Sequence, residues 1–203
     1  MKEHIYYVDG LGRPTGEIDE KLNAHHANTK LHAAFSCYVF NTDGKILVTQ
    51  RAHTKKVWPG VWTNSCCGHP MPGEEREDAI LRRLSYELGM TARDITCVLP
   101  HYVYKAPAYI GIVEHEFCPV YVAVAMSEPH PNPNEVNDFR WLEWREFIDI
   151  LHTDSDNYSV FAQQVPRDDE LGLLHPPKWS WWCKDQITLL DTHPIIRKLT
   201  TAR

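Results

Sequence analysis

The 203-residue chain lacks several features that would direct it to a membrane, to secretion or to nucleic acid. No apolar run approaches the roughly 20 residues that a membrane span needs, and the N-terminal MKEHIYYVDG has no apolar signal segment. Six cysteines are too sparse for a disulfide scaffold, so we expect reduced thiols. Basic residues are a minority, with 21 Lys and Arg against 27 Asp and Glu. We therefore expect a cytoplasmic protein without nucleic-acid or membrane partners.

The remaining composition is that of an ordinary globular protein. Hydrophobic residues make up 43% of the chain and charged residues 24%, and the length suffices for one large core. No internal repeat or low-complexity segment divides the chain. We predict a single domain, in which the positions of the 12 histidines and 7 tryptophans matter more than their number.

The first half of the chain has the pattern of a β-sheet. A strand is predicted at His4–Val8, and the apolar run 31–40 reads as a core strand. The turn 41–44 contains Asp-Gly, which favours a hairpin with the following strand 45–50. Glycine and proline interrupt any periodicity over 51–73, so we predict a long loop there, of the kind that often carries function.

The second half begins with a helix. Residues 74–88 place their apolar side chains on one stripe, acids occupy the first turns, and Gly89 stands where a C-cap belongs. This pattern predicts an amphipathic helix. The further predictions are strands at 96–98, 103–105, 111–113, 117–125 and 141–142, a helix near 143–151, a surface excursion over 152–178, and a last helix from 182 to about 190.

Two pairs of reactive side chains share a spacing of two residues, Cys67 with His69 and Glu114 with Glu116. In extended chain such pairs project to one face, so each pair can serve one site. Imidazoles and carboxylates together suit a divalent metal, although surface histidines and a solvated edge strand would explain the same residues. The candidate ligands are His25, His32, His69, Glu114 and Glu116.

A local group of cations contrasts with the acidic balance of the whole chain. Arg51 and Lys55 lie beside the Gly/Pro-rich loop, and Lys21 and Arg83 can join them. Arginine offers a planar fork and lysine a point charge, so together these four residues can hold a diphosphate. The alternative is a solvated basic turn.

Cysteine and aromatic residues supply the remaining candidates. Cys67 follows Cys66, and an inert buried thiol or a strained disulfide between the two are the simple alternatives. Near metal, imidazole and cations, the pKa of Cys67 would instead move toward neutrality, so that the thiol could exchange a proton. Tyr104 has no functional signal of its own. In the run 179–182 three large rings cannot all be buried on one face, so at least one can line a pocket.

The segment 68–90 resembles the Nudix box of diphosphate hydrolases, a loop–helix–loop written G-x5-E-x7-R-E-U-x-E-E-x-G-U. Two positions depart from this pattern: Arg83 stands where the pattern has a Glu, and Tyr86 replaces the first member of its Glu-Glu pair. Nudix hydrolases use these carboxylates to gather Mg²⁺ around the diphosphate, so the departures argue against hydrolysis. The matching residues are Gly68, Glu74, Arg82, Leu84, Glu87, Gly89 and Met90.

With these two departures, the sequence resembles one branch of this superfamily, the type 1 isopentenyl-diphosphate Δ-isomerases. The stretch 58–70, WPGVWTNSCCGHP, is its most specific feature, and Cys66 there stands where a small apolar residue is expected. The resemblance implies an α+β fold, a Nudix-type α/β/α sandwich with a mixed β-sheet in a single domain. Its core would span about 30–150, with 152–178 as a surface insertion and 179–193 as a C-terminal helix. The other matching motifs are His25-x6-His32, Arg51-x3-Lys55, Tyr86-Glu87-Leu88-Gly89 and Glu114-His115-Glu116.

The resemblance also implies a reaction, the interconversion of isopentenyl and dimethylallyl diphosphate in isoprenoid biosynthesis. A proton is added and another removed through a tertiary carbocation, with Cys67 and Glu116 on opposite faces of the substrate and Tyr104 beside Glu116. Mn²⁺, Zn²⁺ or Mg²⁺ would occupy the site of three histidines and two glutamates, and a second Mg²⁺ would contact Glu87 and Cys67. The residues that would bind the substrate are Lys21, Arg51, Lys55, Arg83 and Trp182. The protein would be a monomer or a weak homodimer.

Two alternatives remain at this point. A Nudix hydrolase of a nucleoside or other diphosphate would release phosphate, and a non-catalytic Nudix module would tolerate loss of Cys67 and Glu116. Incubation with isopentenyl diphosphate and Mg²⁺ separates them, because only the isomerase yields product without phosphate.

Overall fold

The protein is built on two mixed β-sheets flanked by helices, and the computed structural model describes residues 3–24, 26–107, 112–153 and 178–201. One sheet has the strand order β2-β1-β3-β10-β9. The other has the order β12-β5-β4-β11-β8, with β6 beside β5 and β7 beside β4. The elements are β1 (His4–Val8), β2 (Pro14–Glu20), α1 (Lys21–Ala24), β3 (His32–Ala33), β4 (Phe35–Phe40), β5 (Ile46–Arg51), β6 (Trp62–Thr63), β7 (Cys66–Gly68), α2 (Arg76–Leu88), β8 (Ala92–Leu99), β9 (Val103–Pro107), β10 (Val113–Phe117), β11 (Val120–Ala125), β12 (Val136–Leu142), α3 (Trp144–Thr153), α4 (Trp181–Leu190) and α5 (Pro194–Thr201).

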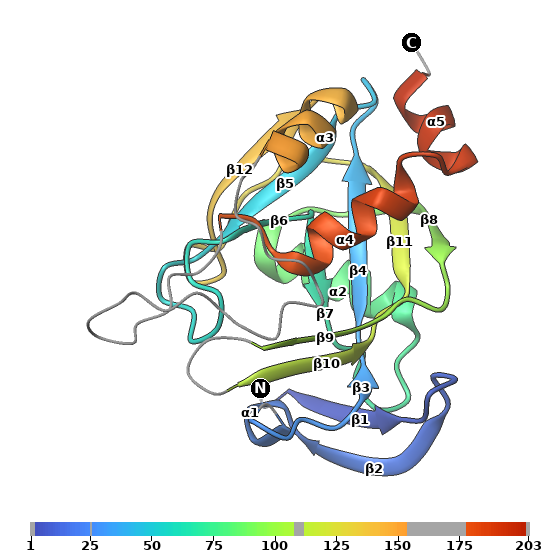
Figure 1. The fold of residues 1–203 in the computed structure, drawn as a ribbon. Coiled ribbons are helices and arrows are strands. Elements are labelled where there is room, and N and C mark those ends of the chain that lie inside the picture. Colours follow the sequence, from blue (N-terminus) through green and yellow to red (C-terminus); the bar gives the residue numbers. More distant parts are fainter. Residues whose placement is uncertain (1–2, 25, 108–111, 154–177, 202–203) are drawn as a thin grey trace.

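Strand β4 is the centre of the larger sheet, and its side chains alternate between two cores. Phe35 and Val39 pack with the apolar stripe of α2, whereas Tyr38 and Phe40 pack with α3 and α4. In Figure 1, α4 crosses in front of β4 while α2 lies behind it. The sheet is therefore enclosed between helices on both faces, which confirms the α+β sandwich with a mixed sheet.

Helix α2 carries the residues of the Nudix-like pattern, and its position depends on two glycines. Gly89 ends the helix at φ 57° and donates its N–H to the carbonyls of Leu84 and Ser85. Gly68 lies in β7 where that strand approaches the helix, since a Cβ there would be 3.0 Å from Cγ of Arg83 and 3.1 Å from Cζ of Phe35. The chain is thus packed tightly where the loop before α2 crosses the helix.

The smaller sheet aligns three chemically active residues across neighbouring strands. Glu116 of β10 is in register with His32 of the parallel strand β3. On its other side Glu116 is in register with Tyr104 of the antiparallel strand β9. In the larger sheet, β7 pairs with β4 so that Cys67 faces Ser36. The two sheets therefore bring segments far apart in sequence to one location.

Several sequence predictions differ from the observed elements. The loop predicted over 51–73 contains β6 and β7, because pairing with β5 and β4 overrides its glycines and prolines. The strand predicted over 117–125 is two strands, β10 and β11, separated at Cys118 and Pro119, because proline cannot donate to a ladder. Pattern reasoning also missed β2 and α5, and it began the long helix at residue 74 where α2 begins at Arg76.

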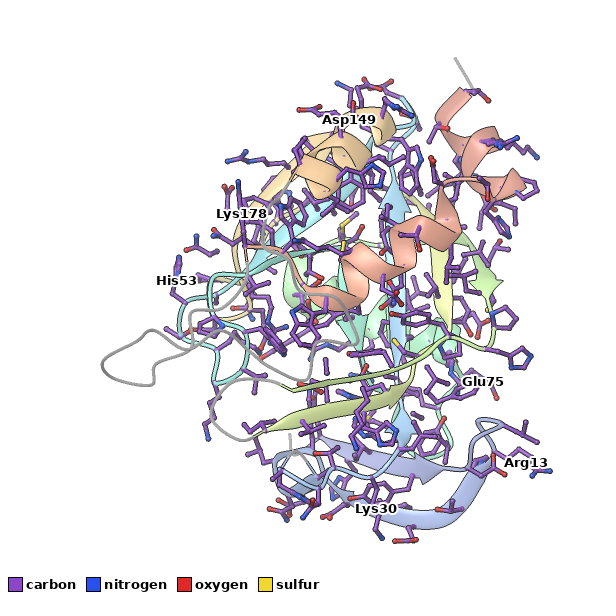
Figure 2. The ribbon with its side chains drawn as sticks, in the orientation of Figure 1. Arg13, Lys30, His53, Glu75, Asp149 and Lys178 are labelled. Atoms are coloured by element: carbon purple, nitrogen blue, oxygen red, sulfur yellow. The ribbon has the colours of Figure 1, made fainter. Side chains whose placement is uncertain are left out.

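Some predictions lie outside the described residues. Most of the predicted excursion 152–178 is in this category, as are His25 and the first residue of the predicted strand 111–113. Figure 2 shows charged side chains such as Arg13, Lys30 and Asp149 at the periphery of the described part. None of the helices that the structure describes has the length and apolar character that crossing a membrane would require.

Candidate active site

Two histidines and one glutamate converge between the two sheets. His32, fully buried on β3, places its Nε2 3.2 Å from Nε2 of His69, which follows β7. The same nitrogen of His69 is 3.0 Å from Oε1 of Glu116 on β10. One ligand atom from each residue lies within 4.8 Å of the others, which is the arrangement of a metal-binding group.

The tautomer of His32 supports this interpretation. Its Nδ1 lies 3.0 Å from the carbonyl oxygen of Lys30, an acceptor, so the ring hydrogen is on Nδ1 and Nε2 carries the lone pair. Such a second hydrogen bond is what orients histidine ligands in metal sites. Two nitrogens and one oxygen also form the mixed donor set that suits a divalent transition metal. The residues present therefore fit a metal ion.

The remaining predicted ligands are placed less completely. Glu114 lies two residues before Glu116 on β10 and is partly buried, and its carboxylate is not among the three ligand atoms that converge. His25 lies outside the described residues. The structure thus brings together three of the five residues that the resemblance implies.

Glu116 connects the histidines to an aromatic region. Its Oε1 contacts His69, while its Oε2 accepts a hydrogen bond of 2.8 Å from the hydroxyl of Tyr104. Burial raises the pKa of Tyr104 well above its ordinary value, and the charge of Glu116 raises it further, so the phenol keeps its proton and donates it. Each oxygen of this carboxylate therefore has a different environment.

Cys67 lies on the opposite sheet and has polar neighbours. Its thiol donates to Oδ1 of Asn64 at 3.2 Å and lies 3.4 Å from the hydroxyl of Ser36. Although the residue is partly exposed, its thiol is desolvated, which raises the pKa of Cys67 to about 11, and the charge of Glu116 contributes to this rise. In the protein alone, desolvation keeps the pKa of this thiol high, and the expected shift toward neutrality near a bound metal stays a prediction.

Three aromatic residues, Trp58, Tyr104 and Trp182, pack against one another as an aromatic wall that links the surroundings of the two groups. The ring of Trp182 stacks on Tyr104, with centroids 5.8 Å apart, and its Nε1 donates to Oδ1 of Asn64 at 3.2 Å. Trp58 meets the edge of Trp182 at 5.8 Å. Cys67 and Glu116 are thereby joined through Asn64, Trp182 and Tyr104. Trp182 contacts both Tyr104 and Asn64, while Trp181 packs against Trp58 at 6.0 Å.

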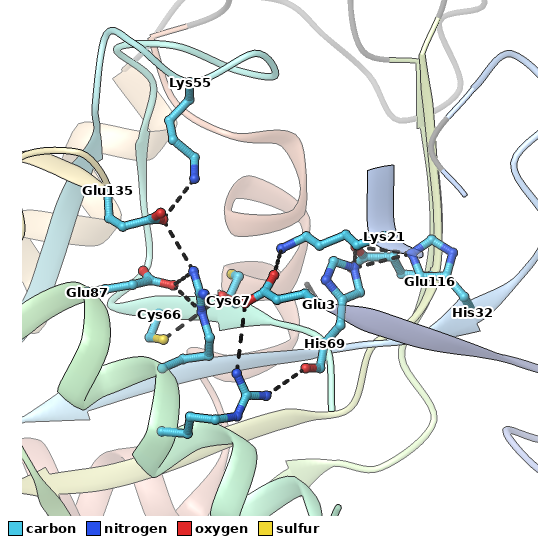
Figure 3. A network of polar contacts seen from close by, with 12 residues as sticks. Glu3, Lys21, His32, Lys55, Cys66, Cys67, His69, Glu87, Glu116 and Glu135 are labelled. Carbon is cyan, nitrogen blue, oxygen red and sulfur yellow. Dashed lines mark hydrogen bonds and ion pairs between the residues drawn. The ribbon is translucent and has the colours of Figure 1, made fainter. Parts of the chain in front are cut away.

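Three of the four predicted phosphate-binding cations, Lys21, Lys55 and Arg83, form a second cluster in which carboxylates join them (Figure 3). Arg83, buried on α2, donates from Nε to Glu87 at 2.8 Å, from Nη1 to Glu3 at 2.7 Å and from Nη2 to Glu135 at 3.2 Å. Burial alone would lower the pKa of Arg83, but these carboxylates raise it. The partners of the lysines are Glu3 for Lys21, at 2.7 Å, and Glu135 for Lys55, at 2.8 Å.

Arg51 is placed differently from the other three cations. Its guanidinium donates to the backbone carbonyls of Val57 and Trp58, at 2.9 and 3.2 Å. Trp58 has a positive φ of 56°, which is uncommon for a residue with a side chain and marks a constrained loop. Arg51 therefore stabilises the loop that positions Trp58, one of the rings in the aromatic wall.

Sequence reasoning missed four residues that connect the site. Glu3 and Glu135 bridge the cations, and Ser36 and Asn64 contact the Cys67 thiol. Asn64 lies within the specific stretch 58–70, and this position could have identified it as a candidate site residue. The glutamates had no such signal, because their partners lie far away in sequence.

At the two unusual positions of the Nudix-like pattern, the structure shows one inward and one outward side chain. Arg83 points into the carboxylate cluster, whereas Tyr86 is exposed and lies beneath the guanidinium of Arg83 at 5.3 Å. Glu74 of the pattern is paired with Arg82 at 2.7 Å. Helix α2 therefore presents a cation where the hydrolase pattern has a carboxylate.

Comparison with known proteins agrees with this geometry at the level of fold. A family model described as the NUDIX domain matches residues 30–165. Among solved structures, DR0079 from Deinococcus radiodurans superimposes with a TM-score of 0.56 at 19% identity, covering 74% of this chain and 89% of that one. The two findings together define a Nudix fold.

Sequence relatives narrow the class. The chain is 47% identical to the isopentenyl-diphosphate Delta-isomerase of Saccharopolyspora erythraea over 178 residues, covering 87% of this chain and 91% of the relative. It is 51% identical over 144 residues to the protein of that name from Salmonella heidelberg, covering 71% and 79%. The chain therefore belongs to the isopentenyl-diphosphate Delta-isomerase family of the Nudix fold.

Proposed function

We propose that the protein is an isomerase that interconverts isopentenyl diphosphate and dimethylallyl diphosphate. The observation that supports this proposal is the chain of contacts that links Cys67 of the larger sheet to Glu116 of the smaller one through Asn64, Trp182 and Tyr104. Family membership supports the same activity. A Nudix hydrolase is disfavoured, because Arg83 stands where the hydrolase pattern has a carboxylate.

The reaction needs one group that gives a proton and one that takes a proton. The C3=C4 double bond of isopentenyl diphosphate takes up a proton at C4, which generates a carbocation at C3, and loss of a proton from C2 then forms the C2=C3 double bond. We assign these steps to Cys67 and Glu116, whose roles exchange in the reverse direction. Tyr104 holds Glu116 in place through its hydroxyl. One proton enters and one leaves, so no redox cofactor is required.

The tertiary carbocation must be protected from water. The rings of Trp182 and Tyr104 are each less than 10% exposed, and together they form one side of the region between the proton-handling groups. An aromatic face stabilises a desolvated cation by about 2 kcal/mol. The same wall excludes the water that would otherwise add to C3.

The diphosphate is assigned to the cluster around Arg83. Lys21, Lys55 and Arg83 supply positive charge, but Glu3, Glu87 and Glu135 already balance it. An anionic substrate therefore needs a further cation to enter this cluster, which supports a Mg²⁺ ion near Glu87 and the carbonyl of Cys67. Arg51 contributes by holding the loop at Trp58.

The metal of the histidine site is assigned to His32, His69 and Glu116, with His25 and Glu114 completing the set that the resemblance implies. Mn²⁺, Zn²⁺ and Mg²⁺ are the expected occupants. When bound, such an ion would supply positive charge beside the Glu116 carboxylate. The protein residues themselves orient the carboxylate, exclude water and carry the protons.

The direct test is an incubation of the purified protein with isopentenyl diphosphate, Mg²⁺ and Mn²⁺. We expect dimethylallyl diphosphate to accumulate until equilibrium without release of phosphate. Phosphate release without the isomeric product would instead identify a hydrolase. Binding of the diphosphate with neither product would indicate a non-catalytic module.

A further inference from the structure

Asn64 is fully buried between β6 and β7, and several parts of the larger sheet hold it in place. Its Nδ2 donates to the carbonyl oxygens of Cys37 and Cys66, at 3.0 and 3.1 Å. Because both partners only accept, these bonds identify the amide nitrogen and leave Oδ1 as the acceptor. The backbone carbonyl of Asn64 in turn accepts from the hydroxyl of Thr49 at 3.0 Å. The orientation of this amide is therefore fixed.

The oxygen of this amide connects two functional side chains. The thiol of Cys67 and the indole Nε1–H of Trp182 both donate to Oδ1, each at 3.2 Å. The hydroxyl of Thr63 lies 2.9 Å from the same atom. One rigid oxygen thus holds a sulfur atom from β7 and a ring from α4, two elements that lie far apart in the sequence.

We propose that Asn64 is a positioning residue, whose Oδ1 sets the distance and angle between the Cys67 sulfur and the face of Trp182. The inference rests on the proposed isomerase activity, in which Cys67 exchanges a proton with the substrate and the ring of Trp182 stabilises the carbocation. Reacting atoms must lie about 3 to 3.5 Å apart, and a misplacement of about 1 Å costs about 100-fold in rate. Asn64 acts only through Cys67 and Trp182, so its loss affects the chemical step more than diphosphate binding.

The test compares Asn64→Ala with Ser65→Ala. Ser65 is an equally buried neighbour, but its hydroxyl bonds to the backbone N–H of Val39 and the carbonyl of Leu47. We expect Asn64→Ala to lower kcat by about 100-fold while KM for isopentenyl diphosphate changes less than about threefold. Ser65→Ala should lose stability but keep kcat. Equal kcat values for the two variants would overturn the proposal.

A second readout does not depend on turnover. Alkylation of Cys67 by iodoacetamide, followed by peptide mapping, reports how the thiol is held. Loss of the Asn64 acceptor should raise the alkylation rate about 3- to 10-fold relative to wild type and Ser65→Ala. An unchanged rate in Asn64→Ala would show that the amide does not hold the thiol. If the wild type had no isomerase activity, the proposed function would be refuted, but the alkylation rates would still test whether Asn64 holds the Cys67 thiol.

The link to the indole has its own variant. Trp182→Phe keeps an aromatic ring but removes the N–H donor, and we expect kcat to fall about 3- to 10-fold. Added to Asn64→Ala, the same substitution should cause no further loss, because the shared oxygen is already gone. Independent, multiplicative losses would contradict the proposal. If Asn64→Ala fails to fold, an unchanged kcat in Trp182→Phe would also overturn it.

Discussion

The two ends of the candidate site differ in how they hold charged and protic groups. Around Arg83 and the lysines, full charges are paired with carboxylates at 2.7 to 3.2 Å. Around Cys67 and Trp182, neutral donors meet one amide oxygen, and aromatic rings cover them. One end is thus a balanced ionic cluster and the other a nearly neutral aromatic region.

This difference corresponds to the two requirements of the substrate. A diphosphate needs charge that can be rearranged when it binds, and ion pairs with exchangeable partners provide it. A carbocation needs an environment in which water is absent and positive charge is stabilised only by ring faces and a distant carboxylate. Glu116 is the exception within the aromatic end, because it is shared with the histidines. Substitutions at the aromatic end should therefore change kcat, and substitutions at the ionic end should change KM.

The largest effect is expected from the proton-handling pair. Cys67→Ala and Glu116→Gln each remove a group that must exchange a proton, so we expect kcat to fall by at least about 10³-fold while the fold persists. Circular dichroism and kinetic measurements on each variant check this. Cys97→Ala, at an exposed cysteine, is the matched control and should behave as wild type. Near-normal turnover in Cys67→Ala would show that the aromatic end does not determine kcat, and would contradict the division of roles between the two ends.

The histidine cluster should be the next most sensitive position. His69→Ala removes the imidazole that contacts both His32 and Glu116. The affinity of the site for a divalent metal should therefore fall about 10- to 100-fold. Metal analysis after dialysis measures this directly. His152→Ala, an exposed histidine on α3, should leave the metal content unchanged. Equal occupancy in both variants would show that these residues do not form the metal site.

A substitution at the ionic end should separate KM from kcat. Arg83→Lys keeps the charge but loses the fork that bonds Glu3, Glu87 and Glu135 together. We expect KM for isopentenyl diphosphate to rise about 10- to 100-fold with a smaller change in kcat. Steady-state kinetics on this variant and on the exposed control Arg145→Lys measure the effect. A loss confined to kcat would contradict the assignment of this end to the diphosphate.

The smallest effect concerns the contribution of Glu3 to stability. Burial alone would raise its pKa, but Lys21 and Arg83 lower the pKa of Glu3 from 4.5 to about 2. The unfolded chain therefore takes up the proton first as the pH falls, and the stabilisation is present above about pH 4.5 and lost toward pH 2. Urea midpoints of wild type and Glu3→Gln should differ at pH 7 and converge as the pH decreases toward 2. A difference that stays constant across this range would exclude the ion pairs as its source.

Much of the site was predictable because its residues lie in short, specific motifs. The pattern of residues 74–88 predicted helix α2 to within two residues of its observed start, because local periodicity and turn chemistry determine that part, and the stretch 58–70 singled out Cys67 and His69. The contacts of Arg83 with Glu3 and Glu135 were not predictable, because they depend on strand pairing that brings β1 and β12 beside one helix. Pattern reasoning also missed β2, which is held by its pairing with β1, whereas the division at Pro119 had a local signal in the proline itself.

The central claim is that Cys67 and Glu116 act together on one substrate from two sides. Incubation with isopentenyl diphosphate in D₂O, with the deuterium at each carbon measured by NMR, tests it directly. In wild type we predict deuterium in the methyl group derived from C4 and, through the reverse reaction, at C2. In Cys67→Ala and in Glu116→Gln both signals should disappear together. Deuterium incorporation at wild-type rates in either variant would contradict the account, because one group would then suffice for both proton transfers.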